Sequence, residues 1–139
     1  MNRIEHAEEL FNNGYGCSQA VFLAFADTEN LSREQAAKLS NAFGGGVGGM
    51  QQTCGALCGA MMALSQRISP ADPTDVDGKS AARAQMGQLG HCFQDAFGTM
   101  QCHALLDADA DLPPREDGRK MCTKYVRFCA EMLERMMDL

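Results

Sequence analysis

The sequence lacks the features that mark membrane, secreted and nucleic-acid-binding proteins. No segment approaches the roughly 18 consecutive apolar residues of a membrane span, and no apolar stretch follows the charges of the N-terminal MNRIEHAEEL segment. The basic residues are scattered along the chain, and the formal net charge is −6. We therefore expect no membrane insertion, no nucleic-acid partner and a cytoplasmic location.

Several cofactor and enzyme motifs are also missing. No CxxCH sequence is present, which excludes covalent attachment of a c-type haem. Gly44, Gly46 and Gly49 match GxGxxG, but a dinucleotide site needs this motif after a strand, and here it follows an expected helix. The GKS sequence at 78–80 resembles the end of a P-loop, yet Pro73 stands where the first glycine should be. Nucleotide binding is therefore unsupported, as is a Cys-His hydrolase, because no nucleophile elbow accompanies the thiols.

No segment shows the alternation typical of a β-strand, whereas helical periodicity recurs along the chain. A length of 139 residues is enough for one packed domain and too short for two. We predict an all-α, single-domain bundle of about five or six helices over residues 1–139. The expected helices cover 2–13, 17–26, 32–43, 54–67, 79–97 and about 116 onward, with a short turn of helix over 102–106 and a linker over 69–78.

Seven cysteines are present without a secretion signal, and this number is odd. A reducing cytosol makes little use of structural disulfides, so metal binding or thiol redox chemistry is the leading explanation. Free cysteine is also a small and commonly buried residue. We therefore expect only some of the seven to be functional.

The segment at 44–59, GGGVGGMQQTCGALCG, places a cysteine where a glycine-rich turn meets a helix of small residues. Unpaired N–H groups and the positive end of the helix dipole lower the pKa of a thiol at such a position, so Cys54 is predicted to be a thiolate. The glycine turn is either a flexible connection or a close backbone approach to a bound anion, cluster or ligand. The glycines expected to line such a site are Gly44, Gly45, Gly46, Gly48, Gly49 and Gly55.

Other cysteines have weaker positional signals. Cys58 follows Cys54 at i, i+4, which puts both within reach of one metal, although helical geometry disfavours a disulfide between them. The HC pair at 91–92 and the CH pair at 102–103 offer zinc ligands without the CxxC spacing that makes a zinc site specific. Cys129 has a packing interpretation on the last helix, whereas Cys122 is expected near the start of that helix.

The order of these motifs resembles a known family. GCSQAV at 16–21, the FGGGVGG turn, CGALCGA at 54–60, and the later Cys102 and Cys122 resemble the redox-active protein family named for its C_GCAxxG_C_C cysteine pattern. The resemblance covers about residues 14–129, with CGAxxG matched from Cys54 to Gly59. It implies that the characteristic cysteines are Cys17, Cys54, Cys102 and Cys122, and it gives no role to Cys58, Cys92 and Cys129.

The resemblance and the thiols together imply two kinds of redox chemistry. Four converging thiolates suit a [2Fe–2S] cluster or zinc, with N–H groups of the glycine turn directed at the sulfurs. Thiols that meet in pairs suit thiol–disulfide exchange, in which one thiolate attacks and its neighbour resolves. A structural zinc module and an interaction scaffold remain as alternatives. We also expect a homodimer formed through an apolar helix face and a redox partner protein.

Overall fold

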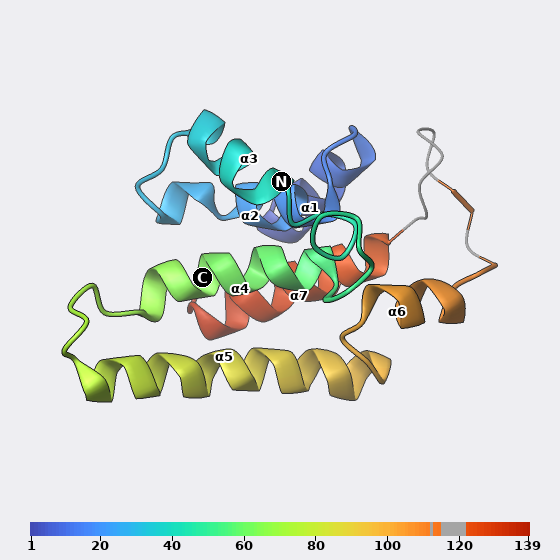
Figure 1. The fold of residues 1–139 in the computed structure, drawn as a ribbon. Helices are drawn as coiled ribbons and strands as arrows, with labels where there is room; N and C mark the ends of the chain where they lie inside the picture. The colour runs from blue at the N-terminus through green and yellow to red at the C-terminus, as the bar shows by residue number, and fades with distance from the viewer. Residues whose placement is uncertain (112, 115–121) are drawn as a thin grey trace.

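Helices form the regular structure of the computed structural model, which describes residues 1–111, 113–114 and 122–139 (Figure 1). These described residues contain seven α-helices, one 3-10 helix and no strand, which confirms the all-α class. The predicted number of helices is wrong, because the segment after Gln101 forms a separate helix instead of a short turn. The elements are α1 (Arg3–Asn12), α2 (Cys17–Ala24), η1 (Ala26–Thr28), α3 (Arg33–Asn41), α4 (Gly55–Ile68), α5 (Val76–Phe97), α6 (Cys102–Ala108) and α7 (Thr123–Met136).

Local hydrogen bonds set most of the helix ends. The Ser32 hydroxyl accepts the Gln35 N–H at 3.1 Å, which confirms the predicted capping box of α3. Gly98 ends α5 with a φ of +84°. α5 begins before its predicted start, because the Asp75 carboxylate accepts the Gly78 N–H at 2.8 Å and caps the helix there. The predicted start of the last helix, near residue 116, lies outside the described residues.

Helix α4 lies at the centre of the fold and packs against α2, α5 and α7. Figure 1 shows α1, α2 and α3 on one side of α4 and α7, with α5 on the opposite side. Small residues on α4 allow this packing, as the sequence predicts. A Cβ on Gly59 would lie 2.4 Å from the Ser18 carbonyl oxygen, so α2 and α4 approach each other through their backbones.

The hydrophobic core connects these helices and includes much of α7. Tyr125, Cys129 and Leu133 are buried on α7, and Phe128 and Met132 pack against the same core. Burial of each large apolar side chain contributes roughly 1.5–3 kcal/mol to folding. The apolar side of α7 therefore faces the core.

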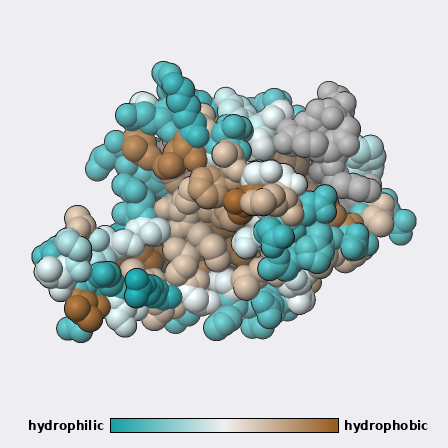
Figure 2. All heavy atoms as spheres, viewed as in Figure 1, coloured by the Kyte–Doolittle hydropathy of each residue, from teal (hydrophilic) through white to brown (hydrophobic). Residues whose placement is uncertain are grey.

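One face of the molecule combines apolar and hydrophilic regions. Figure 2 shows apolar side chains across the middle of this view, over α4, with hydrophilic side chains around them. Leu39 of α3, which is 49% exposed, and Met62 of α4 both line a cavity of 480 Å³. None of the helices in the described part of the chain is long and apolar enough to cross a membrane.

Candidate functional site

The glycine-rich turn between α3 and α4 is a left-handed coil. Residues 45–49 all have positive φ, between +62° and +73°. Glycine adopts this conformation without steric penalty, whereas at Val47, with φ +65°, the Cβ atom is crowded against the backbone and strains it. A Cβ on Gly46 would lie only 2.6 Å from the Cβ of Cys102. The turn therefore needs glycine both for its backbone and for its contact with a cysteine.

Many amide groups of this turn bind within the turn itself. The N–H groups of Val47, Gly48 and Gly49 donate to backbone carbonyls of residues 42–44, at 2.8 to 3.2 Å. The prediction that such groups point at cysteine sulfurs is wrong for these amides, because each already has a carbonyl partner. Gly44, Gly45 and Gly48 line a cavity of 400 Å³ whose described lining contains no cysteine. Cofactor binding by the six predicted glycines stays a prediction.

A short backbone bridge brings the turn to the beginning of α6. Thr53 and Gln101 form an isolated antiparallel bridge. Next to it, the Cys54 N–H donates to the Met100 carbonyl at 2.8 Å, and the Cys102 N–H donates to the Gln52 carbonyl at 2.5 Å. Two cysteines far apart in the sequence are therefore held on neighbouring backbone segments.

Cys17 reaches the same place from α2. It is the first residue of that helix, and its sulfur lies against Gly55 at the beginning of α4. A Cβ on Gly55 would lie 2.4 Å from the Cys17 Sγ atom. The glycine after Cys54 therefore makes room for the thiol of Cys17.

Cys54 occupies the N-cap position at the predicted start of α4, but its thiol is buried instead of activated. The residue is only 5% exposed, and burial is the largest cause that raises the pKa of the Cys54 thiol. The nearby backbone N–H groups of Leu57 and Ala56 lower this pKa, but less than burial raises it. The predicted Cys54 thiolate is therefore wrong, because desolvation of the charged sulfur outweighs the effect of the helix end.

Other thiols gather around Cys17. Burial, followed by the charges of Cys17 and Cys102, raises the pKa of Cys58 to about 11. Burial and then Cys17 raise the pKa of Cys102. Burial also raises the pKa of Cys129, with further contributions from Cys54, Cys17 and Cys58. Cys17 is thus among the causes that raise the pKa of four of the six other thiols, those of Cys54, Cys58, Cys102 and Cys129.

The causes of the raised pKa values therefore link the predicted cysteines with two further ones, Cys58 and Cys129. Cys54 also responds to the charge of Cys122, which lies at the beginning of α7. The family pattern left out Cys58 and Cys129, and the i, i+4 spacing from Cys54 was the sequence signal for Cys58. Cys92 is exposed on α5 and contributes to none of the raised thiol pKa values.

The possible metal ligands do not form a preformed metal site. In the described residues, no three His, Cys, Asp or Glu side chains are arranged to hold one metal ion. His91, Cys92 and His103 are all exposed, so the two predicted zinc-ligand pairs are not brought into one buried site. All seven cysteines are free thiols.

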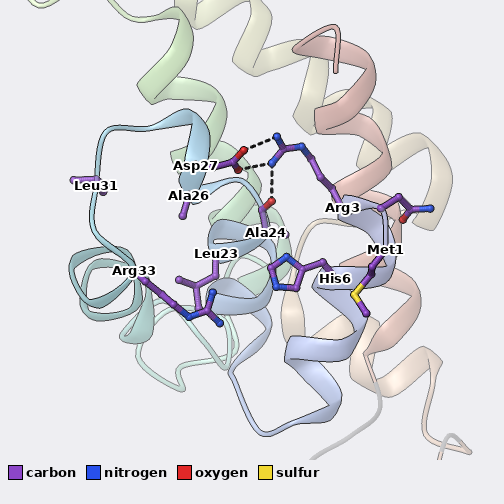
Figure 3. Close-up of a pocket in the computed structure, with 10 residues that line it drawn as sticks. Met1, Arg3, His6, Leu23, Ala24, Ala26, Asp27, Leu31 and Arg33 are labelled. Atoms are coloured by element: carbon purple, nitrogen blue, oxygen red, sulfur yellow. Dashed lines mark hydrogen bonds and ion pairs between the residues drawn. The ribbon is translucent and has the colours of Figure 1, made fainter.

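A separate cavity of 640 Å³ lies between α1, the end of α2 and the beginning of α3 (Figure 3). Arg3 donates to both carboxylate oxygens of Asp27, at 2.6 and 2.8 Å, and to the Ala24 carbonyl at 2.9 Å. The hydrogen bond from Arg3 is the largest cause that lowers the pKa of Asp27. The described lining contains no cysteine, so this cavity is distinct from the thiol cluster. That cluster consists of Cys17, Cys54, Cys58, Cys102, Cys122 and Cys129.

The cysteine arrangement agrees with a family match. The family model described as "Putative redox-active protein (C_GCAxxG_C_C)" matches residues 15–136, and the chain belongs to this family. The matched region contains all seven cysteines. The resemblance inferred from the sequence is thereby confirmed. No curated protein and no solved structure matches the chain.

Proposed function

We propose that this protein carries out thiol–disulfide exchange at a dithiol centre built around Cys17. The observation that supports this most directly is the position of the Cys17 sulfur, which lies against Gly55 at the beginning of α4, next to Cys54 in the sequence. Cys17 is also among the causes that raise the pKa of Cys54, Cys58, Cys102 and Cys129, after burial. Cys17 is partly exposed, whereas Cys54 and Cys129 are buried, so Cys17 is the more accessible residue for an outside reactant. The family description supports the same general chemistry.

The reaction joins two protein thiols and reduces an external disulfide. The Cys17 thiolate attacks one sulfur of the external disulfide, forms a mixed disulfide and releases one external thiol after protonation. A second protein thiol then attacks the Cys17 sulfur, forms an internal disulfide and releases the other external thiol. Two protein thiols are oxidised, and one external disulfide is reduced to two thiols. The natural external reactant is a disulfide of a redox partner protein in a reducing compartment.

The metal-based predictions are not used in this reaction. The donor residues described above do not fit a preformed [2Fe–2S] or zinc site, so no step passes through a metal. Both cofactors stay predictions, as does the homodimer. Broad visible absorption with bound iron, or stoichiometric zinc, in anaerobically purified protein would favour the metal-based alternatives.

A thiol titration of the Cys17→Ser variant tests the proposal. The reduced wild-type protein is expected to lose an even number of free thiols on mild oxidation, because each internal disulfide consumes two. Cys17→Ser should lose its free thiols at least about tenfold more slowly, since one sulfur of the internal disulfide is gone. Cys92→Ser is the matched control, because Cys92 is exposed and outside the cluster. Oxidation of Cys17→Ser at the wild-type rate would contradict the proposal.

A further inference from the structure

Cys58 lies three residues after Gly55 on α4, and Gly55 is the residue that the Cys17 sulfur contacts. The Cys17 sulfur occupies the space beside Gly55, where a Cβ would lie 2.4 Å away. Residues three apart on a helix are neighbours, with about 5–6 Å between their Cβ atoms, so Cys58 is adjacent to the Gly55 position that Cys17 covers. The effect of Cys17 on the pKa of Cys58 agrees with this proximity.

The two thiols of α4 differ in their surroundings. Cys54 is 5% exposed at the N-cap of α4, and burial raises the pKa of its thiol. Cys58 is partly exposed, and its thiol donates a long hydrogen bond of 3.8 Å to the Thr53 carbonyl. A thiol held by so weak a contact turns toward Cys17 at little cost. Burial raises the pKa of the Cys54 thiol further than that of Cys58, so Cys54 is the poorer nucleophile of the two.

Cys102 is more restricted than Cys58. Its backbone N–H is bound to the Gln52 carbonyl, and its Cβ lies against Gly46. The Cys102 side chain therefore has a fixed backbone on one side and the left-handed coil on the other.

We infer that Cys58 is the resolving thiol of the exchange reaction, the residue that attacks the mixed disulfide on Cys17. This inference rests on the proposed function and identifies its second sulfur. The Cys58 sulfur forms a bond to the Cys17 sulfur, and the bond from Cys17 to the external sulfur breaks. The proton of the Cys58 thiol ends on the released external thiolate, so the products are a Cys17–Cys58 disulfide and one free external thiol.

The test follows the reaction of the reduced, full-length protein with oxidised glutathione by mass spectrometry of acid-quenched samples. Wild type and the Cys92→Ser control should pass through a short-lived glutathione adduct on Cys17 and then form the internal disulfide. In Cys58→Ser the adduct should persist at least about tenfold longer, because its resolving sulfur is absent. Loss of the adduct from Cys58→Ser at the wild-type rate would overturn the role of Cys58.

Peptide mapping of the oxidised wild-type protein gives a second result that does not depend on a variant. Cleavage after Leu57 separates Cys54 from Cys58, so the partner of Cys17 is identified directly. A Cys17–Cys58 link is expected, whereas a link from Cys17 to Cys54 or Cys102 would overturn the inference and leave the proposed function intact. Absence of both the adduct and an internal disulfide in wild type would overturn the proposed function itself.

Discussion

The sulfur of Cys17 lies where a side chain on Gly55 would have to go. A Cβ at Gly55 would be 2.4 Å from that sulfur and 3.1 Å from the Phe43 carbonyl oxygen. This contact joins the first turn of α2 to the first turn of α4. The position of the central thiol therefore depends on the absence of a side chain at residue 55.

Substitution Gly55→Ala should destabilise the protein by about 1–3 kcal/mol, because the new methyl group displaces the Cys17 sulfur or its surroundings. Urea unfolding monitored by circular dichroism measures this loss. Gly87→Ala is the control on α5, where a Cβ meets nothing within 4 Å. That control should gain up to about 1 kcal/mol from helix propensity. Equal free energies of unfolding for Gly55→Ala and wild type would contradict the contact.

Gly59→Ala should be more damaging than Gly55→Ala. A Cβ at Gly59 would lie 2.4 Å from the Ser18 carbonyl oxygen and 3.1 Å from its carbonyl carbon. Backbone atoms cannot rotate away as a thiol can, so α2 and α4 must separate. Ser18 also donates a buried hydrogen bond of 2.7 Å to the Ser40 carbonyl, which links α2 to α3. Thermal unfolding should show a lower Tm than for Gly55→Ala, and the reverse order would refute this explanation.

Thiol alkylation of the native, reduced protein should separate the cysteines by burial. Cys92 is exposed and should react fastest with iodoacetamide, whereas Cys54 and Cys129, at 5% and 0% exposure, should react only after unfolding. Burial raises the pKa of both buried thiols, which reduces their thiolate fraction further. Mass spectrometry of peptides after timed labelling measures each rate. Native-state labelling of Cys129 as fast as that of Cys92 would be inconsistent with the fold.

Glu29 should make the stability of the protein depend on pH. Its side chain is buried, neither carboxylate oxygen has a hydrogen-bond partner in the described structure, and burial raises its pKa to about 7. Because the folded-state pKa exceeds the unfolded value of 4.5, its contribution to stability is present below pH 4.5 and is lost as pH rises through about 7.

Substitution Glu29→Gln removes this titration and should raise the Tm relative to wild type at pH 8, with a smaller difference at pH 5. Thermal unfolding at both pH values measures the change. Glu5→Gln is the control, because Glu5 is exposed at the first turn of α1. An equal Tm difference at the two pH values would show that ionisation of Glu29 is not the cause.

Local sequence signals predicted much of the fold. The capping box at Ser32, the helix end at Gly98 and the N-cap position of Cys54 depend on residues within one helical turn, so each is readable from a short segment. The start of α5 was placed too late, because the proline-rich and aspartate-rich composition of 69–78 hid the cap at Asp75. The site depends on more distant contacts.

Two features of the site could not be predicted from the sequence. The Thr53–Gln101 bridge joins single residues from distant segments, so it produces no alternation of apolar and polar residues in the sequence. The pKa of Cys54 depends on burial beneath other helices, which outweighs the local helix-end effect that the sequence does reveal. Cys58 was visible as a helical neighbour of Cys54, but only the packing of α2 against α4 shows that Cys17 lies against Gly55, three residues before Cys58.

The most direct test of the central claim is to map the first disulfide that forms when the reduced wild-type protein is mildly oxidised. We expect Cys17 to be one of the two linked residues, because its sulfur lies at the beginning of α4 and it is a cause of the raised pKa of four other thiols. A first disulfide that leaves Cys17 as a free thiol would contradict the account.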